Sequence, residues 1–144
     1  MKKLNKDVTK ILLKFLKRIK QLPLLDIRLS GRDTLRLETG ERLRSEYGYS
    51  YLFSIGTMFD EKSPKFRQYM VFIVEDLSGI LNDEASLNIW PIIYRDDSNT
   101  ILETCCVIRE GHPEEINKTI QLQLVNQAKQ YISELNAAGY IGTR

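Results

Sequence analysis

The sequence predicts an α+β domain in which about six largely antiparallel strands form a meander and two amphipathic helices, one near each end of the chain, pack on one face of the sheet. Three observations lead to this prediction. Apolar residues recur with a helical period over the first 22 residues, with a two-residue period from Leu25, and with a helical period again after Pro113. We expect all 144 residues to form one domain.

Residues 4–22 are expected to form the first helix. Their apolar side chains fall within an arc of roughly 140° on a helical wheel. These are Leu4, Val8, Ile11, Leu12, Phe15, Leu16, Ile19 and Leu22. Leu13 falls among the lysines on the opposite side, and Pro23 should end the helix because the residue before a proline avoids helical geometry.

The middle of the chain contains the strand signals. "LDIRLS" and "TLRLE" alternate apolar and polar residues about the turn "SGRD", and "YGYSYLFSI" follows with Tyr49, Tyr51, Phe53 and Ile55 on one side. "QYMVFIVE" is apolar on both faces, as a central strand is. "ASLNIWPIIY" should place Pro91 at an edge or bulge, and "ILETCCVIRE" should form the last strand. Short connections favour an antiparallel arrangement.

The second helix is expected to begin at Pro113, with Glu114 and Glu115 in its first turn. Gly139 should cap its end, with Tyr140 or Ile141 folding back beside it. The buried face should consist of Ile120, Leu124, Ala128, Tyr131, Ile132 and Leu135.

With these elements in place, "YSYLFSIGTMF", "WPIIYRDDSNTILET" and "NQAKQYISELNAAGY" resemble small families of bacterial, phage and plasmid proteins known only as domains of unknown function. The similarity rests on aromatic spacing, a P-x-x-Y-x-D turn region and a helix ending in Gly139. The resemblance implies the same fold and a mobile-element or accessory setting. It supplies no catalytic residues.

Several chemistries can be weighed from residue types. Cys105 and Cys106 are adjacent and poorly placed to bridge one another, and no targeting or membrane segment is visible, so we expect a cytoplasmic protein. A dyad of either cysteine with His112 is conceivable, but core cysteines and a capping histidine are favoured. Three Cys and His residues are too few for a structural zinc site. Phosphate-binding glycine loops are absent, so no cofactor is expected.

One carboxylate cluster could hold a divalent metal. Asp96 and Asp97 lie in "YRDDSNTILET", with Glu103 on the following strand, and a metal-dependent nuclease could use such a set. Asp-Asp-Ser-Asn is also ordinary turn chemistry, and we favour a turn. The tyrosines at 47, 49 and 51 with Phe53 could stack on single-stranded bases, but an aromatic row on one face is more typical of core.

Charge is distributed unevenly. Residues 1–50 contain thirteen Lys and Arg against six Asp and Glu, a formal charge of about +7, whereas residues 51–144 contain eight against thirteen, about −5. Either basic residues pair with acidic neighbours inside the fold, or they attract an anionic partner. The candidate nucleic-acid contacts are Lys3, Lys6, Lys10, Lys14, Lys17, Arg36, Arg42 and Arg44.

The sequence therefore favours a small non-enzymatic binding or accessory module with a protein partner. The first alternative is binding of a nucleic-acid backbone through the basic helix. A metal-dependent nuclease ranks third. No membrane contact is expected, because the apolar helix face is needed to cover the sheet, and exposed strand edges could support a homodimer.

Overall fold

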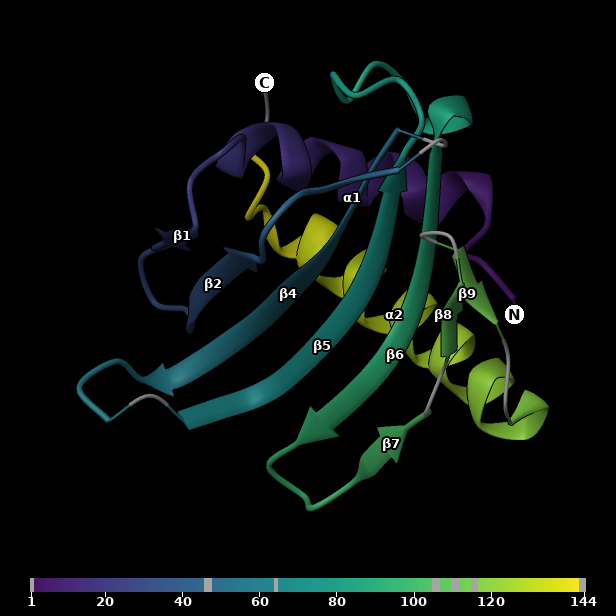
Figure 1. Cartoon of the computed structure of the whole chain (residues 1–144). Helices are drawn as coiled ribbons and strands as arrows, with labels where there is room; N and C mark the ends of the chain where they lie inside the picture. Colours follow the sequence, from purple (N-terminus) through teal and green to yellow (C-terminus); the bar gives the residue numbers. More distant parts are fainter. Residues whose placement is uncertain are drawn as a thin grey trace.

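The computed structural model of the chain describes residues 2–45, 48–63, 65–104, 107–109, 112–114 and 117–142. Two helices and an open antiparallel sheet confirm the predicted α+β architecture (Figure 1). None of the helices in these ranges has the length and apolarity that a membrane span requires.

The main sheet has six strands in a row, each antiparallel to its neighbours. In spatial order they are β1 (Leu24–Ile27), β2 (Thr34–Thr39), β4 (Gly48–Asp60), β5 (Lys65–Asp76), β6 (Leu87–Asp96) and β7 (Ile101–Glu103). β3 (Leu43–Ser45) also pairs with β4, beyond the end of β2. β2 and β3 therefore share one edge of the long β4 strand.

The expected central strand is present, and of the two positions expected for Pro91, an edge or a bulge, the structure has the bulge. Every residue of β5 from Met70 to Asp76 is buried, as its apolar character on both faces predicts. The pairing register of β5 with β6 shifts where Val71 faces Ile93 and Phe72 faces Pro91. The bulge therefore lies beside the proline, which cannot donate a ladder hydrogen bond.

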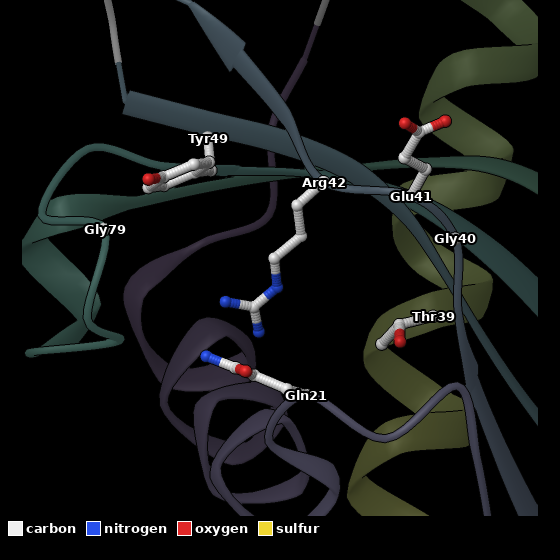
Figure 2. A pocket seen from close by; sticks show the side chains of 7 residues that line it. All are labelled: Gln21, Thr39, Gly40, Glu41, Arg42, Tyr49 and Gly79. Atoms are coloured by element: carbon white, nitrogen blue, oxygen red, sulfur yellow. The ribbon is translucent and has the colours of Figure 1, made fainter.

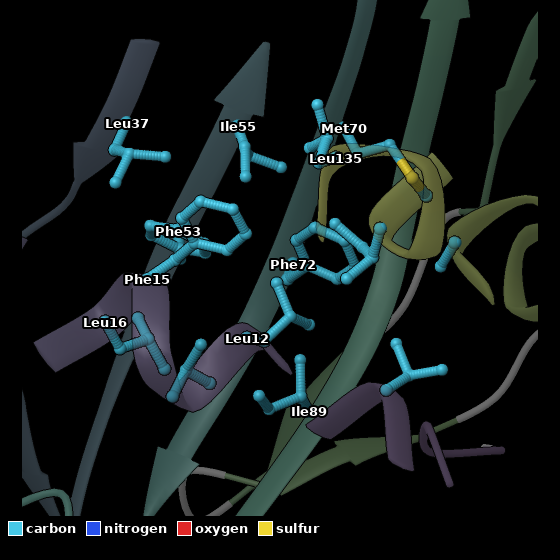
Figure 3. Packing of buried hydrophobic residues seen from close by; sticks show 14 of the residues in the cluster. Leu12, Phe15, Leu16, Leu37, Phe53, Ile55, Met70, Phe72, Ile89 and Leu135 are labelled. Carbon is cyan, nitrogen blue, oxygen red and sulfur yellow. The ribbon is translucent and has the colours of Figure 1, made fainter. Parts of the chain in front are cut away.

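Helices α1 (Lys6–Ile19) and α2 (Lys118–Ala138) cover one face of the sheet (Figure 1). Figure 3 shows the packing: Leu12, Phe15 and Leu16 of α1 lie against Phe53 and Phe72 of the sheet. The two phenylalanine rings stack with centroids 6.4 Å apart. The buried face of α2 agrees with prediction, since Leu124, Ala128, Tyr131, Ile132 and Leu135 are buried and Ile120 packs against them.

The first helix is shorter and rotated relative to the prediction. Asn5 caps it by accepting a hydrogen bond from the Val8 amide at 3.0 Å, and it ends at Ile19, leaving Leu22 half-exposed. Leu13, expected among the lysines, is buried. The reason is tertiary: the short helix η1 (Glu84–Ser86) of the β5–β6 connection packs against α1, and the same connection contributes Leu81 to the core cluster that contains Leu13.

Two other boundaries were predicted wrongly. The segment "ILETCCVIRE" is not one strand, because β7 ends at Glu103 and β8 (Val107–Arg109) pairs instead with β9 (His112–Glu114) in a separate hairpin. Pro113 therefore lies in β9, and α2 begins only at Lys118, capped by the Asn117 side chain. At the other end, Gly139 does cap α2 in the left-handed conformation, and Tyr140 folds back into the core.

Candidate binding groove at the end of the first helix

The five lysines proposed as nucleic-acid contacts divide into two groups. Lys3 donates a hydrogen bond to Asn88 at 2.8 Å, and the Lys10 ammonium lies 3.7 Å from the Glu84 carboxylate. Lys6, Lys14 and Lys17 are exposed and form no hydrogen bond or ion pair within the described part of the chain. Partners within the fold thus account for Lys3 and Lys10, whereas Lys6, Lys14 and Lys17 are accessible to an anionic ligand.

The three candidate arginines lie in different environments. Arg36 forms a two-pronged ion pair with Asp26, at 2.8 and 2.9 Å, and both side chains are largely buried. Arg36 is in register with Gly56 of β4. The neighbours of Gly56, Ile55 and Thr57, face the helices, so strand alternation places the Arg36 side chain on the opposite face of the sheet. Arg44 is exposed on β3, in register with Tyr49. Only Arg42 lies against the end of α1.

Arg42 is held in place from two sides. Its Nη2 donates to the main-chain carbonyl of Lys20 at 3.0 Å, and its guanidinium lies 5.0 Å from the centre of the Tyr51 ring. No carboxylate lies within ion-pair distance of Arg42 among the described residues. Arg42 is therefore an oriented cation with no anionic partner in this part of the chain.

Tyr51 forms the floor beneath Arg42. It is buried, and its hydroxyl has no hydrogen-bond partner among the described residues. Burial raises the pKa of this phenol to about 12; the Arg42 charge opposes that rise and the Asp76 charge adds to it. The ring is thus a neutral, fixed surface for the guanidinium.

Lys20 ends α1 in an unusual conformation. Its φ of 56° and ψ of −117° lie in a region that residues other than glycine rarely adopt. This reversal of the backbone breaks the helix and directs the chain toward β1. It also presents the Lys20 carbonyl to Arg42.

The start of the β5–β6 connection lines the same depression as Arg42. The buried carboxylate of Asp76 holds the conformation of this connection. Asp76 accepts hydrogen bonds from the Ser78 hydroxyl at 2.8 Å, the Gly79 amide at 3.1 Å and the Leu81 amide at 3.0 Å. Gly79 has a φ of +73°, and a Cβ there would lie 3.2 Å from the Tyr49 ring. Glycine is therefore the residue that fits this wall.

Two adjoining hollows result, each of about 430 Å³. Both are lined by Gln21, Arg42 and Gly79, and we call the combined depression the basic groove. Figure 2 shows the Arg42 side chain reaching toward Gln21, whereas the side chain of Glu41, the acidic residue that lines the groove, points the other way. The remaining lining residues are Lys17, Lys20, Thr39, Gly40, Tyr49, Ile80 and Leu81.

Apolar side chains accompany these charges. Ile80 lines the groove and is 76% exposed. Leu22 and Leu43 directly follow the lining residues Gln21 and Arg42, and they are also exposed. The groove therefore combines cations with apolar surface.

The first carboxylate of the cluster, Asp96, holds the turn between β6 and β7. Asp96 accepts hydrogen bonds from the Tyr94 hydroxyl and the Ser98 and Thr100 amides, each at 3.0 Å. Burial would raise the pKa of Asp96, but these hydrogen bonds outweigh it and hold the pKa below its ordinary value.

The other two carboxylates of the cluster are directed elsewhere. Asp97 lies 3.5 Å from Arg67. Glu103 is in register with Ile93, and strand alternation places it on the opposite face of the sheet from Asp96. No group of three metal-ligating side chains occurs within the ranges that the structure describes.

The aromatic row divides between core and groove. Tyr51 and Phe53 are buried, which confirms the core interpretation for them, and Tyr49 is half-buried at the groove. Tyr47, Cys105 and Cys106 lie outside the described residues, as does the side chain of His112, so the dyad remains a hypothesis.

Sequence reasoning named Lys17 and Arg42 but missed Lys20, Gln21, Gly79 and Ile80. The expected helix extended through Lys20 and Gln21, and the turn after β5 carried no signal that it would meet the end of α1. The single glycine at 79 was the available hint of a backbone constraint. No protein-family model, curated protein or solved structure matches this chain.

Proposed function

We propose that this protein is a non-enzymatic binding module that holds an acidic, partly apolar segment of a protein partner in the basic groove. The observation that carries the proposal is the composition of the groove: Lys17, Lys20 and Arg42 have no carboxylate partner among the described residues, and exposed apolar side chains lie next to them. Arginine with exposed apolar surface is typical of protein interfaces.

The volume of the groove agrees with this role. Each hollow falls within the range of roughly 300–1,000 Å³ that small ligand sites occupy, and each is open to solvent. A short stretch of side chains fits such a space better than a folded domain does. Acidic side chains would neutralise the cations, and an aliphatic one would cover Ile80.

The test uses a fluorescein-labelled peptide, GELEELEG, and its uncharged analogue GQLQQLQG, measured by anisotropy at about 50 mM salt, where screening is modest. The groove variant carries Lys17→Gln, Lys20→Gln and Arg42→Gln. The matched control loses the same charge at Arg18, Lys118 and Lys129, which do not line the groove.

We expect the acidic peptide to bind the wild-type and control proteins, and its affinity to fall at least about tenfold in the groove variant. Equal losses in both variants would assign binding to overall charge and contradict the proposal. Failure of the wild-type protein to bind the acidic peptide, or equal binding of the uncharged analogue, would also contradict it.

Binding of a nucleic-acid backbone is the second candidate, and it is favoured by Lys6, Lys14 and Lys17, which are exposed and have no ion-pair partner among the described residues. Three such contacts predict a log-log salt slope of roughly −3 on duplex DNA. Labelled duplex DNA, measured at about 50 and 200 mM salt with a Lys6, Lys14, Lys17→Gln variant beside the wild type, tests this. If the acidic peptide does not bind, and duplex DNA binds with that slope and loses binding in the variant, the ligand is a nucleic-acid backbone and not an acidic peptide.

A further inference from the structure

Lys20 occupies a backbone position that suits glycine. Its φ of 56° with a ψ of −117° strains a residue that has a Cβ. Glycine, which has no Cβ, adopts such positive-φ conformations without strain. The end of α2 is built with a glycine, Gly139, although its φ of 92° and ψ of 13° are those of a left-handed cap and differ in ψ from Lys20. A strained residue at the rim of a groove is a candidate for function, because its side chain supplies something that glycine lacks.

The Lys20 side chain supplies a positive charge. It lines the second hollow together with Lys17 and Arg42. The ammonium has no hydrogen bond or ion pair within the described part of the chain. None of Lys17, Lys20 and Arg42 has an anionic partner among the described residues, so the three cations repel one another, and an anionic ligand would reduce that repulsion.

The Lys20 main chain also acts on Arg42. The carbonyl presented by the strained conformation accepts from Nη2 at 3.0 Å, and the Tyr51 ring supports one face of the guanidinium. The other guanidinium donors make no further hydrogen bond among the described residues. An arginine fixed in this way can bind a carboxylate with little loss of side-chain entropy.

We infer that Lys20 and Arg42 form a subsite for one carboxylate of the acidic segment, with Arg42 as the directional donor and Lys20 as both its positioning group and the second cation. This inference rests on the proposed function and deepens it. Lys17, one helical turn before Lys20, adds positive charge but does not orient the bound carboxylate.

The two roles of Lys20 can be separated by substitution. Lys20→Gly removes the ammonium and relieves the backbone strain, so the melting temperature should rise while affinity for GELEELEG falls by about threefold, as expected for one exposed charge. Arg42→Gln should reduce affinity by about tenfold, and Arg42→Lys should restore little of it, because an ammonium lacks the planar fork.

Arg18→Gln is the control, since Arg18 carries the same charge in the last turn of α1 and does not line the groove. The measurements are peptide anisotropy and thermal unfolding of the full chain. If wild-type protein binds the peptide but Lys20→Gly and Arg42→Gln lose no more affinity than Arg18→Gln, the subsite is wrong while the groove function stands. A melting temperature that falls in Lys20→Gly would also overturn the inference, and absence of binding to wild type would overturn both proposals.

Discussion

The two ends of the sheet use arginine differently. At the end formed by the β1–β2, β4–β5 and β6–β7 turns, each of three arginines lies against carboxylates: Arg36 against Asp26, Arg28 against Glu61 and Asp26, and Arg67 against Asp33 and Asp97. At the end where α1 stops, Arg42 faces a carbonyl, a tyrosine ring and two lysines. Figure 1 shows these ends at opposite extremes of the long strands.

The difference indicates which charges serve the fold. Arg36 and Asp26 are 20% and 11% exposed, so their two-pronged pair satisfies groups that water reaches poorly. The cations of the groove have no such internal anion within the described residues, and holding them close together does not stabilise the fold. The paired end therefore contributes to stability, and the unpaired end is suited to a ligand.

The largest expected effect is a difference in the free energy of unfolding when one arginine is replaced at each end of the sheet. Arg36→Gln leaves the partly buried Asp26 carboxylate with the longer 3.6 Å contact to Arg28 as its one ion pair among the described residues, and should lower the free energy of unfolding by about 2 kcal/mol. Arg42→Gln loses one hydrogen bond to a carbonyl and one ring contact but relieves repulsion, and should cost less than about 1 kcal/mol. Urea unfolding measures both, and equal costs would remove the distinction between the ends.

Acid should weaken the paired end. The hydrogen bond from Arg36 holds the pKa of Asp26 below its ordinary value of 3.8, so the folded state binds this proton less readily than the unfolded state. The stabilisation from Asp26 is therefore fully present above that value and is lost as the pH falls through the lower folded pKa.

We expect the free energy of unfolding of the wild type to fall between about pH 5 and pH 2, and Asp26→Asn to show a shallower fall. Urea unfolding across this range tests it. Glu103→Gln, which removes an exposed carboxylate, is the control and should keep the wild-type slope. An unchanged slope in Asp26→Asn would show that this pair does not contribute to acid sensitivity.

The smallest change in stability should come from adding a carboxylate next to the three cations of the groove. Gln21→Glu places a carboxylate among Lys17, Lys20 and Arg42, and should raise stability by no more than about 0.5 kcal/mol. It should also compete with the acidic peptide and weaken its binding by about threefold. Gln123→Glu, an exposed site on α2, provides the matched control. Equal peptide affinities in the two variants would place the ligand elsewhere.

The sequence predicted the elements that depend on local pattern. The apolar face of α2 follows from the spacing of side chains, and the cap at Gly139 follows from the chemistry of one residue. The chemistry of Pro91 predicted an edge or a bulge, and the pairing with β5 decided for the bulge. The short hairpin of β8 and β9 was missed because three-residue strands carry too little periodicity to separate them from a longer strand or a helix start.

For the site, the sequence by itself determined that cations concentrate in the first 50 residues and that the N-terminal helix exposes lysines, because both follow from composition and a helical period. Only the tertiary structure decided which cations are paired. Asp26 reaches Arg36 across a strand pair, and Glu84 reaches Lys10 from a connection 74 positions away in the chain. The groove likewise joins the end of α1, the β2–β3 connection and the loop after β5, segments whose meeting depends on long-range packing and not on any local pattern.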